Sequence, residues 1–492
     1  MNQRGKVLIV GAGPVGLLAA CEFRRRGVEA DIVDAAPDPG AGSRAILLWP
    51  PSLEIYRDLG ILQEARKRGV AVDALSYHVG GTTLRLPLAL AMSPLILPQQ
   101  DTVELLQEEL HRLGGEVRRG LQVVALTQDR DSITVNARGA DGRETTLEAE
   151  WLIAADGFRS TVRDLIGADF TGAPLPITFL LAEGRLEGDY DTQAVNYYLG
   201  RAGVVLVAPL PGGRVRISGA VPDGTELTAE TGQRLLDERG PGGLRLTDLT
   251  MNTLFTSHER IASPLRAGRC FLAGDAAHVH SVVGGQGLNL GFGDVQNLAW
   301  KLAGVLDGRY APDILDSYHI ERRAAAEQTV QATGRMARQA VLSPVAHRIR
   351  DLVMTLMHRT GVLGRRMPPL LSGRLITYPD TLIPAAGKVP PGLPKPGTRR
   401  PEWALEPDAA DRFQLITTGP DGGRARSQGQ ALADRLPELV AHHHRPGAVD
   451  GFVLLRPDGF VGASGPATAL PHAAIALERL APDASHHVKG QS

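Results

Sequence analysis

One segment near the start of the sequence constrains the fold more than any other. Val7–Val10 is a short, β-branched apolar run that favours a buried parallel strand, and it continues directly into Gly-Ala-Gly-Pro-Val-Gly at residues 11–16. Residues 15–26 then suit a helix, and Val28–Val33 suits a second strand that ends at Asp34. This order predicts a βαβ unit whose first turn is rich in glycine.

Each residue of this turn has its own physical role. Gly11 permits the tight turn, Gly13 lets backbone amides approach a pyrophosphate, and Gly16 lets the helix pack closely on the strand. Pro14 has the backbone angle of a first helical residue, and a helix N-terminus attracts phosphate. Asp34 lies 18 residues after Gly16, where a carboxylate can bind the adenosine ribose. The unit therefore predicts a dinucleotide site, which NAD and FAD would both fit.

A second glycine-rich segment lies in the middle of the chain. The strand-like run Cys270–Ala273 leads to Gly274-Asp275. Gly-Gly-Gln-Gly at 284–287 then precedes a helix whose apolar residues recur every three or four positions from Asp294. Glycine amides in such a turn can stabilise negative charge on a ligand, such as the pyrimidine edge of a reduced flavin.

A third segment, Asp-Gly-Phe-Arg-Ser-Thr-Val-Arg at 156–163, would by itself be an ordinary turn. Together the three segments resemble those of the single-component FAD-dependent aromatic hydroxylases, of the para-hydroxybenzoate hydroxylase and polyketide hydroxylase type. The resemblance covers residues 5–335. It implies that NAD(P)H reduces FAD, and that a flavin C4a-hydroperoxide then transfers one oxygen atom of O2 to an aromatic or polyketide-like substrate.

The same resemblance implies an α/β fold in which a Rossmann-type FAD-binding domain is interleaved with a mixed-sheet substrate domain. A helical region and a thioredoxin-like C-terminal domain follow, and the latter has no Cys-x-x-Cys for dithiol chemistry. The boundaries that we assign are 1–175 and 261–335 for the FAD-binding domain, with substrate-domain strands near 75–100, 176–260 for the substrate-binding sheet, 336–383 for the helical region, 384–401 for a proline-rich linker and 402–492 for the C-terminal domain.

Cofactor contacts are also implied by the resemblance. The residues are Gly11, Gly13, Pro14, Val15, Gly16, Asp34, Arg44, Gln99, Val124, Asp156, Gly157, Gly274, Asp275, Gly285, Gln286, Gly287, Leu288 and Asn289. Among them, Arg44 would lie over the FAD and Gln99 would contact it, while Asp156 and Gly157 would serve both FAD and the nicotinamide nucleotide. Asp275 would bind the ribityl and pyrophosphate region, and residues 287–289 would line the isoalloxazine. No catalytic side chain is assigned.

One departure from the family pattern bears on function. Relatives carry prolines just before the Gly-Gly-Gln-Gly turn, and this chain has Ser281-Val282-Val283. This change is the one sequence feature that favours a non-catalytic flavin-binding protein, and an FAD-dependent dehydrogenase or reductase is a further alternative. No second strand-GxGxxG-helix follows residue 34, so we expect the nicotinamide nucleotide to bind only transiently.

Composition and residue counts exclude several further classes of protein and of site. With 53 Lys and Arg against 54 Asp and Glu, the net charge of −1 gives no attraction to nucleic acid or anionic lipid. Cys21 and Cys270 are too few for a disulfide framework, and His278 and His280 lack a third ligand at metal-binding spacing. No apolar stretch is long enough to cross a membrane. We therefore expect a cytoplasmic monomer or homodimer without a metal.

Overall fold

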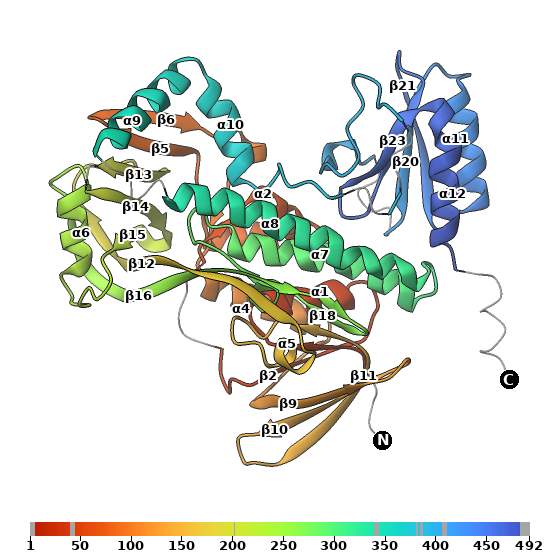
Figure 1. Ribbon diagram of the computed structural model, residues 1–492, viewed down its shortest axis with the longest axis horizontal. Helices are drawn as coiled ribbons and strands as arrows, with labels where there is room; N and C mark the ends of the chain where they lie inside the picture. Colours follow the sequence, from red (N-terminus) through yellow and green to blue (C-terminus); the bar gives the residue numbers. More distant parts are fainter. Residues whose placement is uncertain are drawn as a thin grey trace.

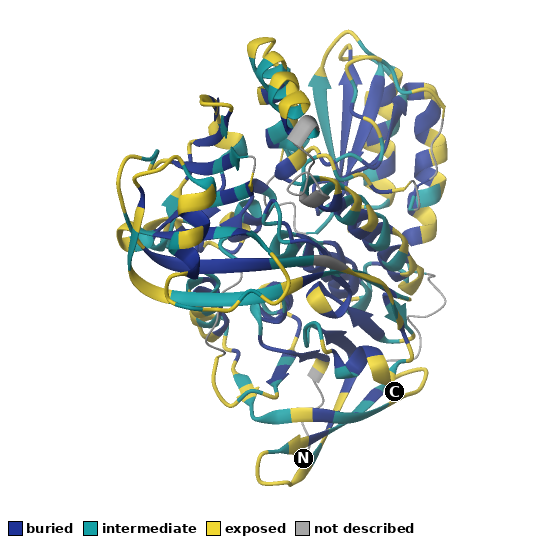
Figure 2. Ribbon diagram, turned by 60° about the vertical axis from the view of Figure 1, so that its left-hand side comes forward, coloured by how far each residue is buried: buried dark blue, intermediate teal, exposed yellow. Residues whose placement is uncertain are grey.

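The computed structural model describes residues 5–39, 45–200, 202–338, 344–379, 382–383, 387–405 and 411–482 (Figure 1). Within these residues, two eight-stranded sheets, a four-stranded sheet and a small three-stranded sheet are combined with helices, which confirms the predicted α/β class. Buried residues concentrate in the sheets and on the inner faces of the helices, and exposed residues in the turns (Figure 2).

The first sheet is built on the predicted βαβ unit. β1 (Gly5–Val10) pairs in parallel with β2 (Ala30–Asp34) and with β11 (Glu144–Ala154), which in turn pairs in parallel with β18 (Cys270–Leu272). Helix α1 (Pro14–Arg24) connects β1 to β2. The other strands of this sheet are β8 (Val117–Arg119), β9 (Leu121–Gln128), β10 (Ile133–Gly139) and β17 (Arg266–Ala267).

The second sheet combines strands from distant parts of the chain. Its order is β19-β16-β12-β15-β14-β13-β5-β6, and β5 pairs in parallel with β13. The strands are β5 (Ala74–Val79), β6 (Thr82–Pro87), β12 (Asp169–Glu187), β13 (Ala194–Gly200), β14 (Gly203–Leu210), β15 (Arg214–Val221), β16 (Arg245–Ser263) and β19 (His278–Val279). We keep the domain boundaries as a proposal, in which β5 and β6 belong to the substrate domain.

Helices and a small sheet fill the space around the two large sheets. Helix α7 lies beside α8 across the middle of the molecule, and α9 and α10 lie near β5 and β6 (Figure 1). The helices are α2 (Pro50–Asp58), α3 (Leu62–Arg68), α4 (Gln99–Arg112), α5 (Thr161–Leu165), α6 (Thr231–Arg239), α7 (Gly287–Leu306), α8 (Ser317–Arg338), α9 (Pro344–Arg359) and α10 (Val362–Leu371). The small sheet consists of β3 (Leu47–Leu48), β4 (Val70–Ala71) and β7 (Leu95–Ile96). Short 3-10 turns occupy Leu90–Met92, Pro211–Gly213, Gly274–Ala276, Pro312–Asp316, Pro401–Trp403 and Ala467–Ala469.

The C-terminal unit has the order β-α-β-β-β-α, one strand more than the β-α-β-β-α order that the sequence predicts. The additional strand is β21, which contains the polar run His442–His444, a sequence typical of a solvated surface segment. Its sheet has the order β21-β20-β22-β23, with α11 (Arg424–Arg435) and α12 (Leu470–Leu480) packed together. The strands are β20 (Phe413–Gly419), β21 (Val440–Pro446), β22 (Gly451–Leu455) and β23 (Val461–Pro466). Every helix in the described parts of the chain is too short or too polar to span a bilayer.

Buried charges join the C-terminal unit to the helices. Arg456, directly after β22, donates to both carboxylate oxygens of Glu321 on α8, at 2.6 and 2.9 Å, and also to Asp458. Lys301 of α7 donates to the same Glu321 at 2.8 Å. All four side chains are almost completely buried. Because removing one partner would leave a buried charge unpaired, this cluster restricts how the two parts can pack against each other.

We predict that Arg456→Met lowers the free energy of unfolding by about 3–5 kcal/mol, because Glu321 and Asp458 lose a buried cation. Arg435→Met is the matched control, since its ion pair with Glu478 has side chains 61% and 41% exposed. We expect that variant to lose about 1 kcal/mol or less. Urea denaturation followed by circular dichroism measures both, and equal losses would contradict the prediction.

Candidate active site

The three glycine-containing segments meet because their strands are neighbours. β1, β11 and β18 are parallel and adjacent, so the turns that follow them emerge at the same edge of the first sheet. Residues 11–16 follow β1, Asp156-Gly157 follows β11, and Gly274-Asp275 follows β18. Ligands of open parallel sheets bind at this carboxyl edge.

Two glycines of the first turn are required by the fold itself. Gly11 has φ +100°, and a Cβ on it would lie 2.3 Å from the carbonyl oxygen of Ala155. A Cβ on Gly16 would lie 1.8 Å from the carbonyl oxygen of Gly11. At Gly13, in contrast, a Cβ would meet no protein atom within 4 Å. Gly13 therefore faces open space, as a glycine that admits a ligand should.

Asp34, at the end of β2, stabilises the glycine turn and remains partly exposed. One carboxylate oxygen accepts a hydrogen bond from the backbone N–H of Ala12 at 2.5 Å, and the other accepts from Ala36 at 2.7 Å. The side chain is partly exposed. The carboxylate thus fixes the glycine turn from the end of β2 and stays accessible at the place predicted for ribose recognition.

A large cavity opens in front of these turns. Its volume is about 1550 Å³, and it extends from the glycine turn to the second sheet and to helices α9 and α10. The predicted residues that line it are Gly13, Pro14, Val15, Gln99, Gly157, Asp275, Gly285, Gln286, Gly287 and Leu288. Gln99 also holds Ala45 through its backbone N–H, at 3.0 Å, and its side-chain oxygen, at 3.3 Å.

Several other predicted residues that the structure describes do not line the cavity. Neighbouring backbone or side-chain atoms leave little or no room for a Cβ at Gly11, Gly16 or Gly274. The backbone N–H of Gly274 also donates to the Asp294 carboxylate at 2.9 Å. Val124 is half-buried on β9, and Arg44 lies outside the described residues. The three glycines therefore shape the turns around the cavity without lining it.

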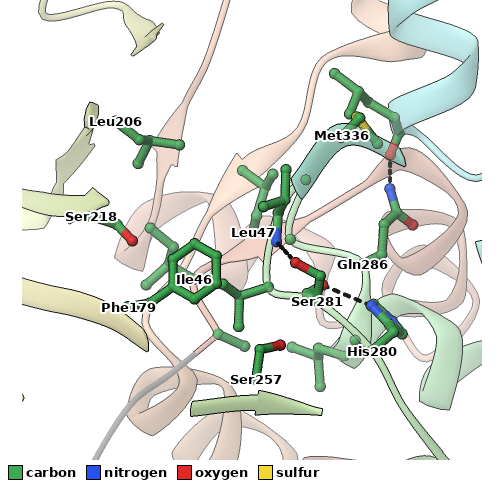
Figure 3. Close-up of a pocket in the computed structure, with 18 of the residues that line it drawn as sticks. Ile46, Leu47, Phe179, Leu206, Ser218, Ser257, His280, Ser281, Gln286 and Met336 are labelled. Carbon is green, nitrogen blue, oxygen red and sulfur yellow. Dashed lines mark hydrogen bonds between the residues drawn. The ribbon is translucent and has the colours of Figure 1, made fainter. Parts of the chain in front are cut away.

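Two further predicted residues have side chains that hydrogen-bond to other residues of the protein. Asp156 accepts hydrogen bonds from Ser160 Oγ at 2.6 Å and from the backbone N–H of Val162 at 3.1 Å, so it holds the start of α5. Burial raises the pKa of Asp156 above its ordinary value, against these hydrogen bonds. Gln286 donates its side-chain amide to the Leu371 carbonyl at the end of α10 (Figure 3).

Asn289 ties the second glycine segment to the small sheet. Its amide donates to the carbonyls of Leu47 and Gly285, both at 2.8 Å, and its oxygen accepts from Trp49 N at 2.8 Å and from Ser52 Oγ at 2.7 Å. The side chain is therefore fully engaged within the protein. Sequence reasoning predicted a cofactor contact here and missed this bridging role, because the partners lie some 240 residues away in the chain.

The two histidines of the second segment differ in their surroundings. His278 Nε2 lies 2.7 Å from the Asp294 carboxylate, in the interior. His280 lines the cavity, and its Nδ1 donates to the Ser281 carbonyl at 2.8 Å. Burial lowers the pKa of His280 to about 4, so the ring is neutral at neutral pH and Nε2 carries no proton. No cluster of three metal-ligating side chains occurs among the residues that the structure describes.

The sequence predicted a substrate-binding sheet at 176–260 but named no individual residue of the cavity wall in it. Arg216 and Ser218 of β15 face the cavity, and the period of two in Arg214–Val221 was the available signal. Arg216 is buried and donates to Glu183 at 2.9 Å. Ile46, Phe179 and Leu206 face the same space (Figure 3). Four methionines, at positions 336, 354, 357 and 367, complete the helical side.

Residues 4–333 match the protein family described as an FAD binding domain. The chain belongs to the FAD-dependent aromatic hydroxylases. It is 32% identical to 6-methylpretetramide 4-monooxygenase of Streptomyces rimosus, over 94% of this chain and 90% of that protein. It is 33% identical to pentachlorophenol 4-monooxygenase of Sphingobium chlorophenolicum, over 67% and 64%. The solved structure of OxyS anhydrotetracycline hydroxylase from Streptomyces rimosus is similar, with a TM-score of 0.75 and 28% identity over 98% of this chain and 99% of that one.

The protein is therefore an FAD-dependent monooxygenase, and its site fits the cofactor. The open space at Gly13 adjoins the N-terminus of α1, which has no side-chain cap. The N-terminus of α7 likewise has no side-chain cap and meets the cavity at residues 285–288. Unpaired helix N–H groups at both places can receive a phosphate and the electron-rich edge of a flavin.

We predict that Gly13→Ala folds like the wild type but binds FAD at least about tenfold more weakly, because the methyl group occupies the space through which the amides reach the pyrophosphate. Gly422→Ala is the control, since a Cβ there also meets no atom within 4 Å but lies in the C-terminal unit. Fluorescence titration of FAD into the apo-protein measures the dissociation constants. Equal affinity in all three proteins would contradict the proposed pyrophosphate site.

A pH dependence follows from His280. Its pKa falls from the ordinary 6.5 to about 4 on burial, so between these values the unfolded chain binds a proton that the folded chain does not. The free energy of unfolding of the apo-protein therefore decreases as the pH falls through this window, by up to about 1.4 kcal/mol per pH unit from this group. His280→Gln removes this component of the slope, whereas His472→Gln, at an exposed position, leaves it. Urea denaturation between pH 4 and pH 7 measures the slopes, and identical slopes in all proteins would refute the assignment.

Proposed function

We propose that this monooxygenase uses NAD(P)H and O2 to hydroxylate a large, mainly apolar polycyclic aromatic compound. The observation that carries the proposal is the size of the cavity. Its volume of about 1550 Å³ exceeds the range of roughly 300–1000 Å³ usual for a drug-sized ligand. It therefore has room for the cofactor at the glycine turns together with a sizeable substrate against the second sheet.

The walls away from the glycine turns are suited to flat apolar rings. On the sheet side, the rings of Tyr77 and Tyr197 stack at 4.9 Å between neighbouring strands β5 and β13. On the helix side, methionine side chains adapt to irregular apolar shapes. The apolar residues of these walls are Tyr77, Phe179, Leu181, Val195, Tyr197, Leu206, Leu254, Met336, Met354, Met357, Leu363 and Met367.

Charges in this part of the wall already have partners. Arg216 pairs with Glu183, and Arg350 of α9 donates to Asp351 at 2.7 Å. A substrate with an ionised carboxylate would compete with these acids, so the wall favours an uncharged molecule. Relatives that match this chain over nearly its whole length are named for 6-methylpretetramide and anhydrotetracycline, which agrees with a large substrate.

The chain's own contribution is placement and exclusion of water. When bound, FAD supplies the redox and oxygen chemistry. The amides at the start of α1 would bind the pyrophosphate, Asp34 would bind the ribose, and the amides at 285–288 would stabilise negative charge on the flavin. Asp275 lines the cavity and would bind the ribityl chain. The apolar walls keep water away from the reacting atoms.

The test uses the purified holoenzyme with NADPH or NADH. We expect 1,8-dihydroxyanthraquinone to stimulate nucleotide oxidation and oxygen uptake at least about tenfold more than 4-hydroxybenzoate, because the smaller anion leaves the apolar walls unfilled. Mass spectrometry should find a product with one added oxygen atom. Nucleotide oxidation without oxygen uptake would instead support a dehydrogenase, and a protein that binds flavin without reacting would support a non-catalytic role.

Leu206→Trp tests the location of the substrate. We expect the added ring to raise the KM for the polycyclic probe by about tenfold, because it fills the wall of the substrate space, while FAD affinity stays unchanged. Leu352→Trp is the control, since Leu352 is 71% exposed on α9. Unchanged kinetics in the Leu206 variant would contradict this placement.

A further inference from the structure

Two consecutive residues of α8 connect different parts of the molecule. Glu321 binds Arg456 of the C-terminal unit, whereas Arg322 donates its Nε to the Asp294 carboxylate of α7 at 2.6 Å. Glu321, Arg322 and Asp294 are at most 2% exposed. The helix therefore links the C-terminal unit on one side to the cofactor-binding part on the other.

Asp294 holds both ends of the turn that follows β18. One of its oxygens accepts from the backbone N–H of Gly274 at 2.9 Å and contacts His278 Nε2 at 2.7 Å. Burial alone would raise the pKa of Asp294, but His278 and Arg322 hold it below its ordinary value, so the group is a carboxylate. Asp275 lies between the two anchored ends and lines the cavity. The position of Asp275 therefore depends on that of Asp294.

Tyr378 contacts Arg322 from the opposite direction. Its hydroxyl accepts a hydrogen bond from Arg322 Nη1 at 2.8 Å. Its ring stacks on Phe460 of the C-terminal unit, with centroids 3.8 Å apart and planes at 13°. Phe460 is itself fixed by a hydrogen bond from its N–H to Asp458 at 3.2 Å. Tyr378 is thus clamped between the C-terminal sheet and the guanidinium that orients Asp294.

We propose that Tyr378 is a positioning residue for FAD binding, through which the docked C-terminal unit fixes the Gly274–His278 turn by way of Arg322 and Asp294. This inference rests on the proposed contact between Asp275 and the cofactor. It gives the C-terminal unit, which has no redox cysteines, a part in holding the flavin. The path consists of direct contacts: Tyr378 accepts from Arg322, Arg322 donates to Asp294, and Asp294 binds Gly274 and His278.

The test compares two single-atom deletions. Tyr378→Phe keeps the stacking on Phe460 and removes only the acceptor of Arg322. Tyr310→Phe is the matched control. The buried Tyr310 hydroxyl donates to the Asp411 carbonyl of the C-terminal unit at 2.5 Å, and this hydrogen bond involves neither Arg322 nor Asp294. Each variant loses one hydrogen bond of a buried tyrosine hydroxyl.

We expect Tyr378→Phe to weaken FAD binding about three- to tenfold, because only part of the effect of losing a hydrogen bond to a charged group reaches the cofactor through Arg322 and Asp294. The visible circular dichroism of the bound flavin should change with it, because the cofactor's surroundings shift. In Tyr310→Phe both quantities should equal those of the wild type, although the two apo-proteins lose similar thermal stability. FAD titration, flavin spectra and thermal melts of the apo-proteins measure these quantities.

The possible results distinguish the positioning role of Tyr378 from the proposed cofactor site itself. Unchanged FAD affinity and flavin spectrum in Tyr378→Phe would overturn the positioning role. Equal weakening in both variants, in proportion to their loss of stability, would also overturn it, because a general loosening would then explain the effect. A wild-type protein that binds no FAD would instead defeat the proposed cofactor site itself.

Discussion

The contact between Gly16 and the carbonyl of Gly11 is the constraint from which the rest of the site follows. With no side chain between them, α1 can begin directly against the turn after β1, and its free N–H groups then point into the cavity. The carbonyl of Ala155 excludes a side chain on Gly11 in the same way. The turn after β11 is thereby pressed against the turn after β1, and the third turn, after β18, follows because its strand is the next one in the sheet.

Burial of charge is the second theme of the structure. Inside the protein, acids and bases occur in matched groups, such as Lys301 and Arg456 with Glu321, or Arg322 and His278 with Asp294. Such groups stabilise little compared with apolar packing, but they tolerate few alternative arrangements. These charged groups lie where one part of the fold packs against another in a single orientation. The wall of the cavity is instead apolar, and its methionine side chains can adapt to the shape of a ligand.

The features predicted from the sequence are those with local signals. The βαβ unit, the strands of the second sheet near 194–221 and most of the C-terminal elements follow from period-two and helical patterns, and their bounds differ by only a few residues from those observed. The strand expected to begin at Phe179 instead begins at Asp169, and β21 was not predicted because its histidines resemble a solvated segment. The family resemblance, and no local pattern, predicted that the three glycine-containing segments surround one cofactor. The bridging side chain of Asn289 and the cavity wall from α9 and α10 had no local signal, because each depends on partners far away in the chain.

The parallel pairing of β5 with β13 has a practical meaning for anyone who wishes to redesign this protein. The two strands lie more than a hundred residues apart and bracket much of the cofactor-binding sheet in the sequence. Neither the cofactor-binding part nor the substrate-binding part can therefore be expressed as one continuous segment of the chain. A chimaera that takes its substrate specificity from a relative would need β5 and β6 as well as residues 169–263. Without β5 and β6, its substrate-binding sheet would lack the last two strands on one side.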